Sequence, residues 1–226
     1  MIRDVSNWSS RALPGADPLE GRFVTVLPTD PERDAAPLFE VLRSGDPVLW
    51  DYLPYGPFED EAEFAIWLSA HVRAPGLFPR TIVNRGNGMP VGNASFMSIA
   101  QDHGDLEIGN IFFSPTLQRT RMATEAMYLM MRHAFDDLGY RRVVWKCDAN
   151  NARSMRAATR YGFRHEGHFR QHKVIKGKNR DTAWYSVIDG EWLIVKAAFE
   201  AWLNDANFDD DGAQLKSLTD IRAFQN

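Results

Sequence analysis

The chain has 226 residues, the size of one ordinary domain with extensions. Hydrophobic residues make up 44% and charged residues 25%, which excludes an intrinsically disordered chain and indicates a globular fold. The formal net charge of −4 excludes the broad positive field that nonspecific nucleic-acid binding requires, so we expect no nucleic-acid partner and only local anion sites.

Cysteine content and hydropathy restrict the setting. A single cysteine excludes an internal disulfide and a cysteine-based zinc cluster, and it fits a reducing compartment. Residues 1–15 lack the apolar stretch of a signal peptide, and no run approaches the roughly 20 apolar residues of a membrane helix. We therefore expect a cytoplasmic protein without a membrane partner.

Three parts are predicted along the chain. Residues 1–20 lack periodicity and are expected to form an irregular lead-in segment, residues 21–190 the main domain, and residues 191–226 a C-terminal helix and tail. The expected elements of the main domain are a strand at 22–27, helices at about 33–43 and 59–74, two strands around Asn87-Gly88, a strand at 105–113, a helix at about 120–138, a strand at 142–146, a helix at about 151–161, and strands from Phe163 and over 182–188. Asn87-Gly88 between two β-rich runs is typical of a tight hairpin. A strand meander followed by alternating strands and helices predicts an α/β fold with a mixed sheet.

The junction at residues 118–124 joins an expected strand to an expected helix. The first N–H groups of such a helix, together with the positive end of its dipole, form an anion site. Arg119 and Arg121 add positive charge, Ala123 lets a phosphate approach the backbone, and Thr120 or Thr124 can donate a hydroxyl. On this segment alone, a polar helix cap with solvated arginines is the alternative.

A second motif runs from Asn151 to Phe163, with Asn151 and Ser154 at its start and Gly162-Phe163 eight residues beyond the serine. Combined with the strand from Glu107 and the Gln-x-x-Arg-x-Ala junction, it resembles the GNAT superfamily of acyl-CoA-dependent N-acetyltransferases. The likeness is greatest to the RimJ/RimL-type branch. The resemblance spans roughly residues 20–190 and implies the GNAT fold: a twisted, mostly antiparallel sheet, splayed between its strands 4 and 5 and flanked by helices.

The resemblance also implies that acetyl-CoA binds at the junction, where backbone amides cradle its pyrophosphate. The cofactor-binding residues that match the family motifs are Gln118, Arg119, Thr120, Arg121, Met122, Ala123 and Thr124 in the loop, Ile111, Phe112 and Phe113 along the strand edge, and Asn151 and Ser154 beyond the gap. Arg121 stands where a glycine is usual in the family, and we expect its side chain to reach a phosphate. The two phenylalanine side chains fit a core position equally well.

The implied chemistry is direct attack of a primary amine on a thioester. The ammonium must lose a proton, the oxyanion needs a donor, and the leaving thiolate needs a proton. Glu107 has the spacing of the catalytic base in histone-acetylating members; a structural strand role and water-relayed proton loss are the alternatives. Many relatives place an acidic tyrosine where this chain has Ala158. Ser154 is then the candidate acid, with helix capping as its alternative.

The acceptor side is less specified by the sequence. Trp50, Tyr52 and Tyr55 are the candidate substrate-binding residues, although part of this aromatic cluster fits core packing. The RimJ/RimL likeness favours a protein N-terminal amine, with small-molecule amines next, and a noncatalytic acyl-CoA-binding module is the rival function. The histidines within residues 165–172 lack metal-site spacing, so no metal is expected. We expect a monomer or homodimer.

Overall fold

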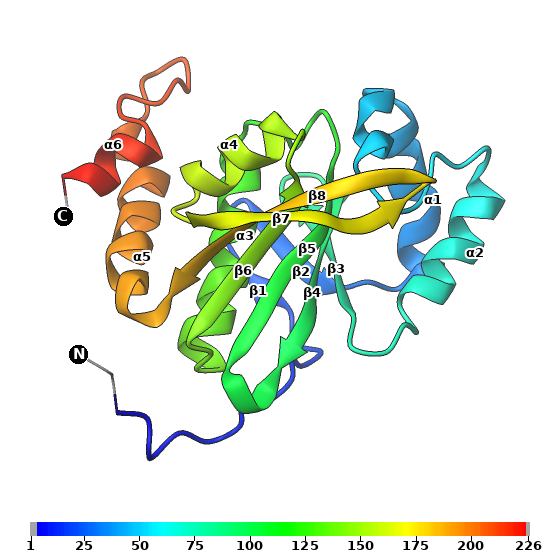
Figure 1. The fold of residues 1–226 in the computed structure, drawn as a ribbon. Helices are drawn as coiled ribbons and strands as arrows, with labels where there is room; N and C mark the ends of the chain where they lie inside the picture. Colours follow the sequence, from blue (N-terminus) through cyan, green and yellow to red (C-terminus); the bar gives the residue numbers. More distant parts are fainter. Residues whose placement is uncertain (1–3, 225–226) are drawn as a thin grey trace.

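The computed structural model describes residues 4–224, which form one eight-stranded sheet with helices on both faces (Figure 1). The strands are β1 (Leu19–Glu20), β2 (Val24–Pro28), β3 (Phe78–Asn84), β4 (Pro90–Ala100), β5 (Asp105–Phe113), β6 (Arg142–Asp148), β7 (Arg164–Ile175) and β8 (Lys178–Ile188). Their order is β1-β2-β3-β4-β5-β6-β8-β7, and every neighbouring pair is antiparallel except β5 and β6. The predicted mixed, mostly antiparallel sheet of the GNAT fold is confirmed.

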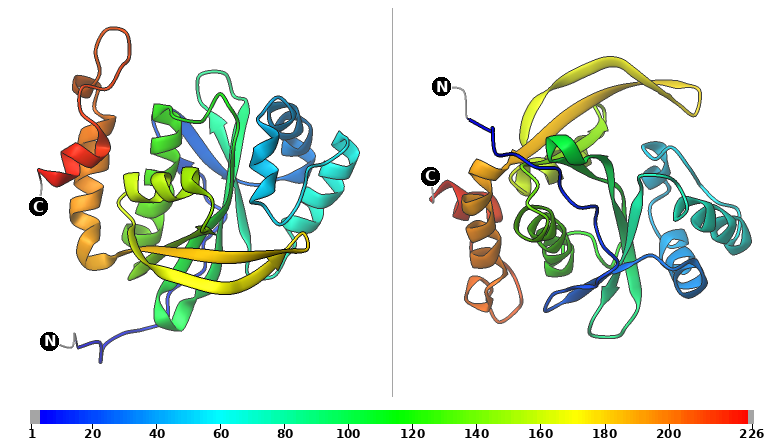
Figure 2. Two further views of the ribbon diagram at one scale, coloured as in Figure 1. Left: turned by 45° about the horizontal axis from the view of Figure 1, so that its top comes forward. Right: turned by 90° about the horizontal axis from the view of Figure 1, so that it is seen from below.

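Helices cover the two faces of the sheet unequally. They are α1 (Pro31–Arg43), α2 (Glu61–His71), α3 (Arg121–Arg132), α4 (Ala152–Arg160), α5 (Asp189–Leu203) and α6 (Leu218–Ala223). In Figure 2, α1 and α2 lie together on one side of the sheet, and α3, α4 and α5 lie on the other. The predicted second helix is shorter than expected because Asp60 caps its start, accepting from the backbone N–H of Glu63.

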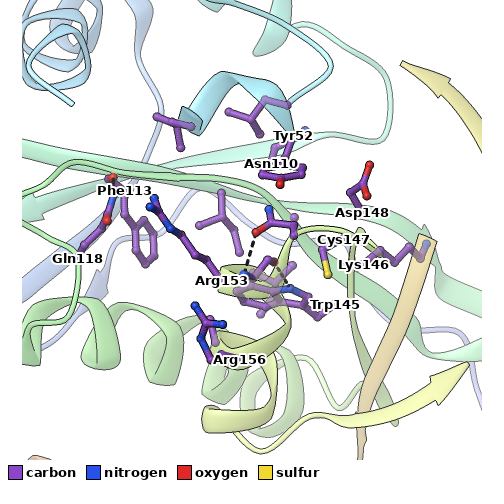
Figure 3. A pocket seen from close by; sticks show the side chains of 18 of the residues that line it. Tyr52, Asn110, Phe113, Gln118, Trp145, Lys146, Cys147, Asp148, Arg153 and Arg156 are labelled. Atoms are coloured by element: carbon purple, nitrogen blue, oxygen red, sulfur yellow. Dashed lines mark hydrogen bonds between the residues drawn. The ribbon is translucent and has the colours of Figure 1, made fainter. Parts of the chain in front are cut away.

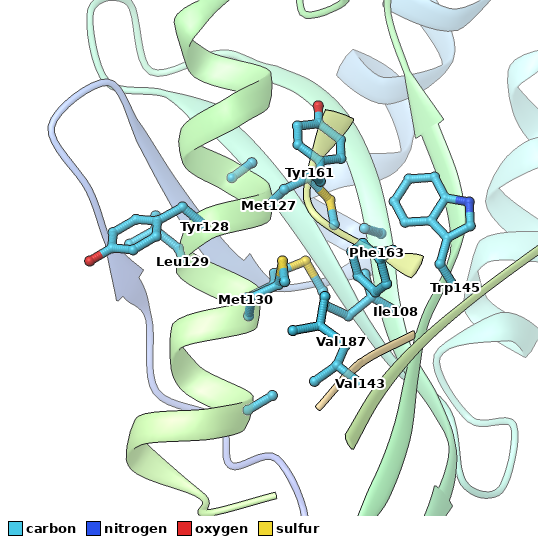
Figure 4. Packing of buried hydrophobic residues seen from close by; sticks show 14 of the residues in the cluster. Ile108, Met127, Tyr128, Leu129, Met130, Val143, Trp145, Tyr161, Phe163 and Val187 are labelled. Carbon is cyan, nitrogen blue, oxygen red and sulfur yellow. The ribbon is translucent and has the colours of Figure 1, made fainter. Parts of the chain in front are cut away.

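Apolar side chains of α3 attach this helix to the sheet. Met127 and Met130 recur at helical spacing and pack toward Val143 of β6 and Val187 of β8 (Figure 4). All four side chains are fully buried, and each such burial stabilises the fold by about 1.5–3 kcal/mol. The N-terminus of α3 is thereby held beside the ends of β5 and β6.

The sheet opens between β5 and β6. Their parallel ladder covers the start of both strands and ends at Glu107, opposite Val144. A bulge follows in β5, where Asn110 and Ile111 oppose the single residue Ala94 of β4, and Asn110 adopts a positive φ of 50°. Because a bulge bends its strand, β5 turns away from β6 and both facing edges lose their ladder partner. Strands 4 and 5 of the predicted order are β5 and β6, so the predicted splay is confirmed. Its local cause is this bulge.

The β7–β8 hairpin reaches across the molecule to the other side of this opening. At its tip, Lys176 Nζ donates to the carbonyl of Trp50 at 2.7 Å, in the 3-10 helix η1 (Pro47–Asp51). Both views in Figure 2 show the hairpin arching toward α1 and α2. The tip of the β7–β8 hairpin is therefore docked against a distant segment of the chain and is not free.

Both terminal segments pack on the domain. The lead-in is held by Trp8 Nε1, which donates to the Asp102 carbonyl at 2.8 Å. In the tail, buried Asn207 donates to the carbonyls of Trp202 and Lys216 at 3.3 and 3.1 Å. Between residues 4 and 224, no helix combines the length and apolar character needed to cross a bilayer.

A partly buried histidine makes stability depend on pH. His71 at the end of α2 stacks on Trp67 at 4.5 Å between ring centroids, and burial lowers the pKa of its imidazole to about 4. The unfolded chain binds this proton near pH 6.5, so protons favour unfolding between these values. We expect the free energy of unfolding to fall as the pH drops from about 6.5 to about 4. The free energy of unfolding, measured by urea titration at each pH of this range, should change less steeply with pH for His71→Phe than for the wild type. His103→Phe, at an exposed position, should keep the wild-type dependence on pH.

Candidate active site

A cavity of about 780 Å³ occupies the opening between β5 and β6. Its walls are the free edges of these two strands, the loop that follows β5, the first turns of α3 and α4, and the β7–β8 hairpin. Figure 3 shows Gln118 and Phe113 at one end of this cavity and Lys146 toward the other.

The first turn of α3, at one end of the cavity, carries backbone N–H groups without a hydrogen-bond partner among the described residues. Thr120 is its N-cap, with Oγ1 accepting from the N–H of Ala123 at 3.2 Å, and the Thr120 carbonyl accepts from the N–H of Thr124 at 3.4 Å. Within residues 4–224, no hydrogen bond uses the N–H groups of Arg121 and Met122. These donors and the helix dipole form a site for a phosphate.

Five of the seven predicted loop residues line the cavity: Gln118, Arg119, Thr120, Ala123 and Thr124. The side chain of Arg121 does not, contrary to our expectation that it would reach a phosphate. Its Nη1 binds Asp205 Oδ1 at 3.0 Å, and its guanidinium carbon lies 3.2 Å from the centroid of the Phe208 ring. The acidic and aromatic C-terminal tail holds this arginine, while Met122 packs its side chain against the core.

Sequence reasoning missed three arginines of α4. Arg153, Arg156 and Arg160 line the cavity, and Figure 3 shows the first two on its α4 side. Arg160 donates from Nη1 to Thr124 Oγ1 at 3.1 Å, which joins α4 to α3. The three arginines recur at i, i+3 and i+7, so helical spacing was a signal that could have found them.

Not all of the cofactor-binding residues predicted along the strand edge lie on the cavity side. Ile111 and Phe113 line the cavity, whereas the Phe112 side chain points to the opposite face and packs in the α1–α2 core, because side chains alternate along a strand. Across the gap, Asn151 caps α4 by accepting from the N–H of Ser154 at 3.0 Å. Ser154 Oγ accepts from Trp145 Nε1 at 2.9 Å and keeps its own proton for donation.

Glu107 lines the cavity where β5 and β6 begin to separate. Its buried Oε2 accepts from Ser98 Oγ and pairs with Lys146 Nζ, both at 2.9 Å. Lys146 also lies over the Trp184 ring, 4.1 Å from the centroid. The sequence did not predict this lysine partner.

Of the three predicted substrate-binding aromatics, only Tyr52 lines the main cavity, and its hydroxyl donates to the Asn150 carbonyl at 3.4 Å. Trp50 packs instead against Phe58, with ring centroids 5.5 Å apart. Tyr55 packs in the α1–α2 core and lines a separate cavity of about 370 Å³. Trp50 and Tyr55 bury their apolar rings against other aromatic side chains, which explains why these two of the three predicted positions lie away from the main cavity.

Metal-binding side chains are dispersed in the described part of the chain. Among residues 4–224, no three His, Cys, Asp or Glu side chains gather in a way that could hold a metal ion. Only His172 of the histidines in β7 lines the cavity, and its Nδ1 lies 3.0 Å from Thr182 Oγ1.

A mixed sheet that opens between two parallel strands beside a helix N-terminus defines the class of GNAT N-acetyltransferases. The family model for the acetyltransferase (GNAT) domain matches residues 24–164, more than half of the chain, and the chain belongs to this family.

Similar proteins agree with this assignment. The crystal structure of a GCN5-related N-acetyltransferase from Brucella melitensis is 39% identical, with a TM-score of 0.93 over 97% of this chain and 100% of that chain. The uncharacterized N-acetyltransferase YnaD of Bacillus subtilis is 26% identical over 151 residues, 66% of this chain and 85% of the relative. Mycobacterium smegmatis RimJ, solved in complex with CoA-disulfide, is 20% identical with a TM-score of 0.63 and covers 74% of this chain and 83% of that chain, so it shares the fold.

Proposed function

We propose that the protein binds acetyl-CoA in the 780 Å³ cavity and transfers the acetyl group to a primary amine. The observation that carries this proposal is the continuity of the cavity. It runs from the α3 start, lined by Thr120, Ala123 and Thr124, along the free edge of β5 to the buried Glu107 carboxylate.

The phosphate end has the donors that a pyrophosphate requires. The N–H groups of Arg121 and Met122 point from a helix N-terminus, and Arg119, Arg156 and Arg160 supply positive charge around them. The edge of β5 at residues 111–113 has no ladder partner on the β6 side and offers the amides of the pantetheine arm a strand to pair with. The Arg121 side chain stays with the tail.

At the reacting end, acetyl-CoA supplies an acetyl group activated as a thioester. Glu107 is placed to take the proton that the attacking amine must lose, directly or through a water. Backbone N–H groups at the Asn110 bulge are free of the β5–β6 ladder and can stabilise the oxyanion. Ser154 can donate its hydroxyl proton to the leaving sulfur, because Trp145 already satisfies its oxygen.

The RimJ/RimL likeness favours a protein N-terminal amine as the acceptor, with a small-molecule amine next. The rival function, a noncatalytic acyl-CoA-binding module, is favoured by Ala158 at the position where many relatives carry a catalytic tyrosine. Release of free thiol from acetyl-CoA, measured against a panel of amines and N-terminal peptides, separates the two. Tight binding of acetyl-CoA with no release above hydrolysis for any acceptor would establish the rival.

The two loop arginines are expected to behave differently. Arg119→Gln should raise the KM for acetyl-CoA about 10-fold, because it removes a charge that faces the cavity. Arg121→Gln should change this KM less than about 3-fold, since its guanidinium is committed to Asp205 and Phe208. Initial rates at varied acetyl-CoA measure both effects. An equal rise in the two variants would show that Arg121 also reaches a phosphate.

A further inference from the structure

The end of the cavity below the β7–β8 hairpin carries an excess of positive charge. Lys146, Lys173 and Arg180 line it, and the acids at this end are Glu107 and Asp148. Glu107 is paired with Lys146 at 2.9 Å. Asp148 Oδ1 accepts from the backbone N–H and the side-chain amide of its neighbour Asn150, at 2.8 and 3.1 Å. Among residues 4–224, no ion pair joins Lys173 or Arg180 to Asp148 or to any other acid, so neither cation has a direct partner.

Arg180 is the more enclosed of these two cations. Its side chain is partly buried, and its Nε is shielded from solvent without any hydrogen-bond partner. Among residues 4–224, no hydrogen bond or ion pair engages this guanidinium. Desolvating a charged group without a partner costs free energy, so a built position of this kind indicates a missing anion. Arg160, the enclosed arginine at the cofactor end, differs from Arg180 because it donates a hydrogen bond to the Thr124 hydroxyl.

The charge of Arg180 acts on the groups around the reacting end. Burial lowers the pKa of His172, and the positive charges of Lys173, Arg180 and Lys146 lower it further. Burial raises the pKa of the Cys147 thiol, and this rise is opposed first by a hydrogen bond from Ser154 and then by the charge of Arg180. Cys147 lies on the β6 edge of the gap and lines the cavity beside Lys146 (Figure 3). Arg180 is thus within electrostatic range of the place where the acceptor amine must arrive.

We propose that the acceptor is an amine that also carries a carboxylate, and that Arg180 binds this carboxylate. The inference rests on the proposed acetyl transfer and specifies its substrate class. An acceptor with only an ammonium charge meets unpaired cations at this end and is repelled. A carboxylate can pair with the planar guanidinium through two parallel hydrogen bonds, which makes arginine the suited partner. The same cations favour the neutral form of the amine, which is the form that attacks.

Acceptor pairs that differ only in charge test this proposal. Free amino acids are compared with their carboxamides, and peptides that begin with Asp or Glu with peptides that begin with Asn or Gln. We expect kcat/KM to be about 10-fold or more higher for the carboxylate member. Preference in the first kind of pair identifies an α-carboxylate as the bound group, and preference in the second kind identifies a side-chain carboxylate.

Variants of the hairpin assign the preference to its residue. Arg180→Gln is expected to remove it and leave the KM for acetyl-CoA unchanged, which also shows that the variant is folded; Arg180→Lys should keep part of it. Lys178→Gln removes a charge from the same strand but outside the cavity, and it should keep the full preference. Equal rates for the members of every pair in the wild-type enzyme would overturn the inference and leave acetyl transfer intact. Binding of acetyl-CoA without transfer to any acceptor would overturn the proposed function and this inference together.

Discussion

Replacement of Glu107 by glutamine is expected to lower kcat/KM for acetyl transfer about 100-fold. Glutamine keeps the shape of the side chain and an acceptor for the Ser98 hydroxyl, but it cannot take a proton from the amine. The loss should therefore appear in kcat, with the KM for acetyl-CoA nearly unchanged.

A matched variant separates this role from the general effect of removing a carboxylate from β5. Asp105→Asn removes a carboxylate two residues earlier on the same strand, where it lies 3.6 Å from Arg142 and does not line the cavity. It should retain activity within about 3-fold. Steady-state rates from about pH 6 to pH 9 measure both variants. A kcat for Glu107→Gln as high as that of Asp105→Asn would remove Glu107 from proton transfer and favour a water relay.

Glu125→Gln is expected to lower the free energy of unfolding by about 3 kcal/mol. The buried Glu125 carboxylate accepts from three backbone N–H groups, those of Arg22, Phe23 and Val24, at 2.7, 2.6 and 2.8 Å. An amide would turn one acceptor oxygen into a donor facing another donor. The effect reaches the cofactor site, because Glu125 fixes the first turns of α3 to the start of β2.

Urea unfolding curves measure this effect as a shift of the midpoint at constant slope. Glu20→Gln is the control: its exposed carboxylate lies 3.5 Å from Arg85, and the expected change is within about 0.5 kcal/mol. Gly21→Ala offers an independent check, since a Cβ there would lie 2.5 Å from the Glu125 carboxylate. A change for Glu125→Gln as small as the control would show that backbone hydrogen bonds to water replace those to the carboxylate at no cost.

Elements with local signals were predictable from the sequence. The hairpin at Asn87-Gly88 joins β3 and β4 as expected, because Gly88 accepts the positive φ that this turn requires. The helix after the junction starts at Arg121 because the hydroxyl of the preceding Thr120 caps its first turn. Element ends were less predictable: β8 begins at Lys178, where the expected strand began at residue 182, because pairing with β7 extends it.

The candidate site was predictable where it depends on spacing along the chain. The loop residues and Ser154 line one cavity because strand and helix lengths bring the two motifs to the same opening. The direction of the Arg121 side chain was not predictable, since its partner Asp205 lies 84 residues later. The position of the Tyr55 side chain was not predictable for a similar reason. Its ring packs against Trp67, at 4.3 Å between ring centroids, in the α1–α2 core.

The sequence by itself determined the family, the mixed sheet and the helix start that offers its N–H groups to a cofactor. These depend on neighbouring residues, whose periodicity and capping act over a few positions. The tertiary structure alone decided the pairing of Glu107 with Lys146, the commitment of Arg121 to the tail and the unpaired state of Arg180. Charge pairing depends on distance in space and on burial, and packing brings together side chains that no local pattern relates.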